Sequence, residues 1–120
     1  MQDERLLEIF RTLADRNRLA IFQLLMTGAH CNCEIGQCLA LPANLISHHL
    51  KVLREAGFID AKRHPTDGRW IIYSINRETL EQARSLTFSF FDPERLGTRH
   101  PDVCASGAMP SCRSDEHSLP

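Results

Sequence analysis

Hydrophobic residues in the first part of the chain recur every three or four positions, which is the spacing of amphipathic helices. Asp15 is a typical capping residue, and Gly28 is suited to end a helix. We therefore expect two helices in series, one on each side of Asp15. Their apolar positions are Leu6, Leu7, Phe10 and Leu13 in the first, and Leu19, Phe22, Leu25 and Met26 in the second.

Two further helices are predicted in the next part of the chain. A short one runs from about Cys33 to Leu41, and Pro42 begins the turn into another that ends at Gly57. The longer helix has two faces. Its apolar stripe is Ile46, Leu50 and Leu53, and its polar stripe is Asn44, Ser47, His48, Lys51 and Glu55. The polar stripe can recognise base edges and phosphates. An Asn side chain can form two hydrogen bonds with adenine, Ser and His can donate or accept hydrogen bonds, and Lys supplies a positive charge. An ordinary solvated helix face remains the alternative.

After Gly57 the period of the pattern changes from helical to alternating. The segments FIDAKRH and RWIIYSI are strand-like, and between them PTDG predicts a turn in which Asp67-Gly68 favours a tight hairpin. This hairpin has a basic tip, where Arg63, His64 and Arg69 can reach phosphates or a minor groove.

Asn76 is suited to cap a final helix that ends in aromatic residues, which we expect to form dimer core. Four of the six prolines fall in residues 92–120, which also contain few aliphatic residues. We therefore predict one domain over residues 1–91 and a flexible, cysteine-containing tail over residues 92–120.

Composition and charge narrow the class of protein. With 120 residues and 42% hydrophobic content, the chain can bury a modest core, and dimerisation is expected to support it. No apolar stretch is long enough for a membrane span, and the charged N-terminus is unlike a secretory signal, so we expect a cytoplasmic protein. The formal net charge is -1, yet residues 42–75 carry five Lys or Arg and three acidic residues. A local basic bias of this kind marks where phosphate contacts can lie.

Three motifs, LADRNRLAIFQLL, ISHHLKVLREAGFI and DGRWIIYSI, occur in this order over roughly residues 6–90 and closely resemble the arsenic-responsive repressor family, often called ArsR/SmtB. The resemblance implies a mainly α fold with a β-hairpin wing, a winged helix-turn-helix of order α-α-α-α-β-β-α. It also implies a homodimer that binds double-stranded operator DNA and is released by an inducer metal. Ser47, His48 and Lys51 would lie in the major groove and Arg69 at the wing, whereas His49 is expected to pack or link.

The stretch HCNCEIGQC looks like the thiolate site that many members of this family carry at the start of the short helix. Cys31 and Cys33 are the expected inducer ligands, because two thiolates two residues apart can meet one ion when the backbone is extended. A helix N-terminus also favours the thiolate. The alternative is that both cysteines are small packing residues. The sequence departs from the best-known family pattern, which would place a third cysteine at Gly36.

Cys38 is therefore the less favoured ligand, since a rotation of about 140° separates it from Cys33 along a helix, and a buried apolar role is preferred for it. Cys104 and Cys112 in the tail are the candidates for the third ligand, the alternative being simply exposed thiols. Three thiolates suit As(III) or Sb(III), and four suit Cd(II), Pb(II) or Zn(II). The final helix has no His, so zinc or nickel sensing through that helix is not expected.

Other functions for the five cysteines remain open at this point. A thiol redox switch on the same fold would release DNA on oxidation instead of on metal binding. A structural zinc site would unfold when a chelator removes the metal. A thiol enzyme is not expected, because there is no Cys-x-x-Cys motif and no evident catalytic base. The preferred hypothesis is a repressor induced by As(III) or Sb(III), and the alternative inducers are Cd(II) or Pb(II).

Overall fold

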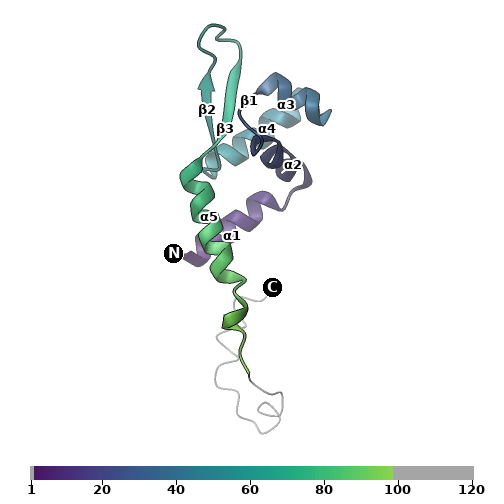
Figure 1. The fold of residues 1–120 in the computed structure, drawn as a ribbon. Helices are drawn as coiled ribbons and strands as arrows, with labels where there is room; N and C mark the ends of the chain where they lie inside the picture. Colours follow the sequence, from purple (N-terminus) through teal and green to yellow (C-terminus); the bar gives the residue numbers. More distant parts are fainter. Residues whose placement is uncertain (1, 99–120) are drawn as a thin grey trace.

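The computed structural model describes residues 2–98, which form helices and one small antiparallel sheet (Figure 1). The order of these elements matches the predicted winged helix-turn-helix: α3 and α4 form the helix-turn-helix, and β2 and β3 form the wing. The elements are α1 (Gln2–Leu13), α2 (Arg16–Leu25), β1 (His30–Cys31), α3 (Asn32–Leu39), α4 (Ala43–Glu55), β2 (Ile59–Arg63), β3 (Ile71–Ile75), α5 (Arg77–Phe90) and the 3-10 helix η1 (Pro93–Arg95).

The helix boundaries follow from local signals in the sequence. The carboxylate of Asp15 accepts hydrogen bonds from the first backbone N–H groups of α2, and the side chain of Asn76 accepts one from the backbone of α5. These bonds satisfy N–H groups that have no partner inside their helices. At the end of α4, Gly57 takes a left-handed φ of 86°, which lets the chain turn directly into β2. The predicted caps are confirmed.

The sheet contains one strand that the sequence analysis missed. The strand order is β1-β3-β2, and both pairings are antiparallel. In β1, His30 pairs with Tyr73 and Cys31 with Ile72. A strand of two residues is too short to show an alternating pattern, so only its partner about forty residues later reveals it. This strand attaches the segment before α3 to the wing.

The hydrophobic core lies where α2, α3 and α4 meet the base of the wing. The largest fully buried side chains there are Ile21, Ile35, Leu53, Phe58 and Ile59. Each such side chain contributes about 1.5–3 kcal/mol relative to remaining exposed. The predicted apolar stripe of α4 is confirmed, because Ile46, Leu50 and Leu53 are all buried. The core therefore holds α4 with its polar stripe turned outward.

Helices α1 and α5 contact one another on the side away from the wing (Figure 1). No residue of α5 is buried, although the helix carries several aromatic side chains. Helix α5 ends at Phe90, next to the predicted domain boundary at residue 91, and η1 follows it. Residues 99–120 lie outside the described structure, so the division into domain and tail stays a prediction. None of the helices within residues 2–98 has the length and apolar character needed to cross a membrane.

Candidate functional site

The polar stripe of α4 is exposed along its whole length. Its exposed side chains are Asn44, Ser47, His48, Lys51 and Glu55. His49 lies next to His48 in the sequence but is only 4% exposed, because it turns into the interface with α2. The expectation that His49 packs or links, instead of facing outward, is confirmed. The stripe thus presents hydrogen-bonding groups and one positive charge, with a single acid near its C-terminal end.

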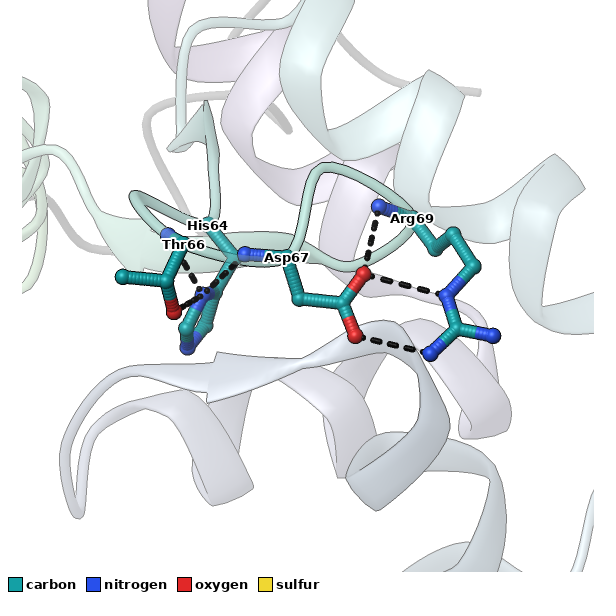
Figure 2. Close-up of polar contacts among 4 residues, drawn as sticks. All are labelled: His64, Thr66, Asp67 and Arg69. Atoms are coloured by element: carbon teal, nitrogen blue, oxygen red, sulfur yellow. Dashed lines mark hydrogen bonds and ion pairs between the residues drawn. The ribbon is translucent and has the colours of Figure 1, made fainter.

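The wing tip is an ordered loop that is wider than a two-residue hairpin turn. The strands end at Arg63 and begin again at Ile71, and the backbone N–H of Trp70 donates to the carbonyl of Asp67 at 3.1 Å. Figure 2 shows His64 beside Thr66 and Asp67, and its Nδ1 accepts from the backbone N–H groups of both residues, at 3.2 and 3.1 Å. A turn is present at Asp67-Gly68 as predicted, but the tight hairpin is wrong, because the longer segment 64–70 joins the two strands.

The two arginines predicted to contact DNA from the wing are exposed, and both are held within the loop. Arg63 donates from Nη1 to the carbonyl oxygen of Gly68. Arg69 makes a two-pronged contact with the carboxylate of Asp67, in which Nε lies 3.0 Å from Oδ1 and Nη2 lies 2.9 Å from Oδ2 (Figure 2). The Arg69 side chain holds the pKa of Asp67 below its ordinary value, and Asp67 raises the pKa of Arg69. The positive charge of Arg69 thus carries a fixed counter-charge.

Cys31 and Cys33 lie at the start of α3 and are both partly buried. Cys31 occupies the N-cap position with an extended backbone, as expected, and Cys33 lies in the first helical turn. The backbone N–H of Cys31 donates to Oε1 of Glu34 at 2.9 Å, and this bond holds the pKa of Glu34 below its ordinary value. Glu34 was not predicted from the sequence, although a glutamate three residues after an N-cap is the spacing of a capping box.

Cys38 is exposed, so its predicted role as a buried apolar residue is wrong. Ile35 marks the buried side of α3. In angle around the helix axis, Cys38 lies closer to the exposed Glu34 than to Ile35. Within residues 2–98, no group of three or more His, Cys, Asp or Glu side chains is arranged to hold a metal ion. The proposed tail ligands Cys104 and Cys112 lie outside the described residues.

A groove of about 390 Å³ lies between α3, α4 and the beginning of β3. Cys33 lines it from α3, Ser47 lines it from the polar stripe of α4, and Trp70 borders it from the wing. Asn32 adds a further connection, because its Oδ1 accepts from the backbone N–H of Ile71 at 3.4 Å. The start of α3 therefore contacts both parts of the molecule that carry the candidate DNA-binding residues.

Comparison with known proteins identifies the family of this arrangement. Residues 15–61 match the family described as bacterial regulatory protein, arsR family. An uncharacterized HTH-type transcriptional regulator of Methanocaldococcus jannaschii is 40% identical over 80 residues, which cover 66% of this chain and 86% of that protein. The arsenical resistance operon repressor of Bacillus subtilis is 34% identical over 72 residues, covering 59% of this chain and 66% of that protein.

A crystal structure of a possible transcriptional regulator for arsenical resistance has the same fold, with a TM-score of 0.62 and 28% identity. That similarity covers 83% of this chain and 95% of the solved chain. The matched region contains the helix-turn-helix, and the similar proteins are DNA-binding transcription regulators rather than enzymes. This protein belongs to the ArsR family of winged helix-turn-helix transcription regulators.

Proposed function

We propose that this protein is a repressor that binds operator DNA through α4 and the wing, and that As(III) or Sb(III) bound by cysteine thiolates releases it. The position of the two cysteines supports this proposal most strongly. Cys31 belongs to β1, which pairs with the wing strand β3, and Cys33 lines the groove beside α4. An ion that draws the two thiols together therefore acts on the wing and on the helix-turn-helix at once. Coupling between two sites typically changes affinity by about 5- to 150-fold.

The outward stripe of α4 supports its role as the helix that enters the major groove. Asn44 can pair with an adenine edge, Ser47 and His48 can donate or accept, and Lys51 can neutralise a phosphate. Arg63 and Arg69 on the wing can reach the flanking backbone or the minor groove. Phosphate contacts position the protein, and the base contacts of α4 provide sequence selectivity.

The inducer proposal rests on thiol chemistry. Arsenious acid has three hydroxyl groups, and each thiol that binds replaces one of them: an As–S bond forms, an As–O bond breaks, and the thiol proton leaves with the hydroxide as water. Cys31 and Cys33 supply two sulfurs. A third can come from Cys104 or Cys112, and Cys38 is the less favoured candidate. Four thiolates would instead favour Cd(II) or Pb(II), which are the alternative inducers.

The surface of α1 and α5 supports a homodimer. Phe10 of α1 packs edge-on against Phe90 and Phe91, with ring centroids 5.7 and 6.1 Å apart. Phe91 is 66% exposed, Phe88 is 79% exposed, and Leu7 adds a further exposed apolar side chain from α1. Exposed aromatic and aliphatic side chains on two contacting helices are typical of an interface. A second copy would cover it and place two α4 helices on a two-fold symmetric operator.

Release from DNA tests the proposal. The reduced protein would first select a duplex from a random-sequence library, and the selected duplex, labelled with a fluorophore, would be titrated with As(III), Sb(III), Cd(II), Pb(II) and Zn(II) in turn. We expect As(III) and Sb(III) to lower the affinity at least about fivefold. Substituting Cys31→Ser or Cys33→Ser should abolish the response without changing affinity in the absence of the inducer.

The tail and surface cysteines provide matched variants. Cys104→Ser and Cys112→Ser identify the third ligand, and Cys38→Ser is the control that should respond like the parent protein. If only divalent ions release the protein from DNA, the inducer is Cd(II) or Pb(II) and not As(III). Release by peroxide, reversed by dithiothreitol and independent of metal, would replace the metal sensor with the redox switch. Failure of every duplex to bind would contradict the repressor itself.

A further inference from the structure

A polar cluster around one buried histidine lies where α1, α2 and α4 meet, and neither DNA contact nor the cysteine site accounts for it. We call Asp15, Arg18 and His49 the Arg18 cluster. Nη1 of Arg18 lies 3.3 Å from Nδ1 of His49, and Nε of Arg18 donates to the backbone carbonyl of Thr12 at 2.7 Å. Asp15 Oδ1 lies 3.9 Å from Nε2 of His49. One arginine thus connects the end of α1 to the middle of α4.

His49 occupies a position that the helical pattern assigns to an apolar residue. It falls on the same side of α4 as Ile46, Leu50 and Leu53, and it is as buried as they are, at 4% exposed. A buried imidazole is costly unless its nitrogens have partners. Within residues 2–98, no buried side-chain nitrogen or oxygen lacks a hydrogen-bond partner, so the cluster satisfies this requirement. The contact with Arg18 needs a lone pair on Nδ1, and only the neutral ring offers one.

The cluster reaches both parts of the molecule that matter for a dimer on DNA. Helix α1 carries the exposed apolar residues Leu7 and Phe10, and α4 carries the outward polar stripe. His49 directly follows Ser47 and His48, and the rings of His48 and His49 lie 5.2 Å apart between centroids. A change in the contact between Arg18 and His49 therefore alters the position of α4 relative to α1. In a dimer, that position decides the spacing of the two recognition helices.

We propose that Asp15, Arg18 and His49 position α4 for operator binding, and that only the neutral form of His49 does so, which makes operator affinity fall as the solution is acidified. The proposal rests on the DNA-binding role proposed for α4 and is independent of the cysteine site. His49 acts here as a positioning residue and does not touch DNA.

The charges around His49 determine the direction of the effect. Burial holds the pKa of His49 below its ordinary value, Asp15 acts in the opposite direction, and Arg18 and His48 lower the pKa further. The neutral ring is therefore the favoured form at pH 7.5, and protonation begins only below the ordinary histidine value. Protonation places a second cation beside the Arg18 guanidinium, removes the Nδ1 acceptor and separates α4 from Arg18.

Direct DNA contact by histidine would have the opposite sign. An exposed histidine that contacts a phosphate gains a positive charge on protonation, and this strengthens binding as the pH falls. A fall in affinity with acid therefore reports on the buried ring and not on the exposed one.

The test measures the dissociation constant for the selected duplex between pH 7.5 and pH 5.5, with reduced protein free of inducer. We expect the parent protein to lose at least about fivefold in affinity over this range. In His49→Asn, the amide oxygen lies close to the former position of Nδ1 and still accepts from Arg18, but it cannot be protonated. This variant should bind within about threefold of the parent protein at pH 7.5 and should lose the acid-dependent weakening.

Asp15→Asn provides a second variant in case His49→Asn does not fold. Asn is a good N-cap residue, so α2 keeps its cap, while the anion that favours protonated His49 is removed. Its affinity should begin to fall at a more acidic pH than that of the parent protein. Circular dichroism and sedimentation at each pH confirm that the protein remains folded and keeps its oligomeric state.

Three results would overturn the proposal. The first is an affinity of the parent protein that rises or stays constant down to pH 5.5. The second is a folded His49→Asn variant that keeps the pH dependence of the parent protein, and the third is an unchanged midpoint in Asp15→Asn. Lys51→Gln tests DNA contact by α4 separately from the role of the Arg18 cluster, because this variant weakens binding at every pH if α4 contacts DNA. If Lys51→Gln has no effect, the proposed role of α4 is wrong, whatever the pH profile shows.

Discussion

Cys31 lies directly opposite Ile72 in the antiparallel pairing of β1 with β3. Ile72 in turn pairs with Lys62 of β2, so a candidate ligand thiol is two strands away from the outer strand of the wing. The next residue, Asn32, extends the link by accepting a hydrogen bond from Ile71. The wing and the candidate cysteine site therefore share one small sheet, so a displacement of Cys31 would act directly on β3.

Removing the Asn32 side-chain bond should weaken this link. In Asn32→Ala, we expect DNA affinity without inducer to change by less than about twofold, while the loss of affinity caused by As(III) becomes about two- to tenfold smaller. Fluorescence anisotropy with and without As(III) measures both quantities. Cys38→Ala, also on α3 but exposed, is the matched control. An unchanged response in Asn32→Ala would show that the signal does not pass through β3.

The ion pair at the wing tip predicts a gain of binding from the loss of an acid. Asp67→Asn removes the counter-charge of Arg69 and one negative charge near the proposed phosphate contacts. DNA affinity should therefore rise about three- to tenfold at low salt. The slope of log affinity against log salt concentration should become steeper by about one. Titrations at several salt concentrations measure this slope. Arg69→Gln should weaken binding, and the double variant should resemble Arg69→Gln. If Asp67→Asn instead lowers the affinity for DNA, the main role of Asp67 is to order the loop and not to neutralise Arg69.

The outward stripe of α4 should divide into residues that give selectivity and residues that give affinity. Asn44→Ala should cost about 1–3 kcal/mol on the selected duplex and much less on random DNA, as expected for a base contact. Lys51→Gln should weaken binding to both duplexes equally, and the slope of log affinity against log salt concentration should decrease by about one. Competition binding with selected and random duplexes separates the two cases. An equal loss on the selected and the random duplex in Asn44→Ala would argue against a base contact by Asn44.

The aromatic surface of α5 should be required for assembly but not for folding. Phe91 is largely exposed, so Phe91→Asp should leave the helical circular dichroism signal unchanged while converting a dimer into a monomer. Sedimentation velocity measures the change. Leu19→Asp introduces the same charge at a partly exposed position of α2, outside this surface, and serves as the control. A Phe91→Asp dimer as stable as the parent would place the interface elsewhere.

Acid should reduce stability as well as DNA affinity. The pKa of His49 is lowered in the folded state, so the unfolded chain binds a proton first, and stability is lost as the pH falls from the ordinary histidine value through the folded pKa. The pKa of Asp15 is also lowered, chiefly by the backbone N–H of Arg18, so its contribution is lost only below about pH 4, its ordinary range. Urea unfolding between pH 7.5 and pH 5 should show a decrease for the parent protein and a smaller one for His49→Asn.

Features that depend on neighbouring residues could be predicted from the sequence. The caps at Asp15 and Asn76 need only the first turn of a helix, and the left-handed turn at Gly57 needs only a residue without a Cβ. The two faces of α4 follow from a period of 3.6 residues. The helix-turn-helix and the outward polar stripe were therefore correct before any contact was known. The thiols of Cys31 and Cys33 were also correctly expected at the start of α3.

The order of the helices, the location of the wing and the chemistry of the exposed stripe follow from local periodicity and caps, so the amino-acid sequence was sufficient to predict them. The tertiary structure was needed to establish that Cys38 is exposed, that Asp67 holds Arg69, and that β1 joins the cysteines to the wing. It also decided that His49 meets Arg18 across two helices. The pairing of β1, the contact of His49 and the exposure of Cys38 depend on how elements distant in the sequence pack against the core, so the residues on either side do not determine them. The contact between Asp67 and Arg69 is local, but it depends on the conformation of the whole wing loop.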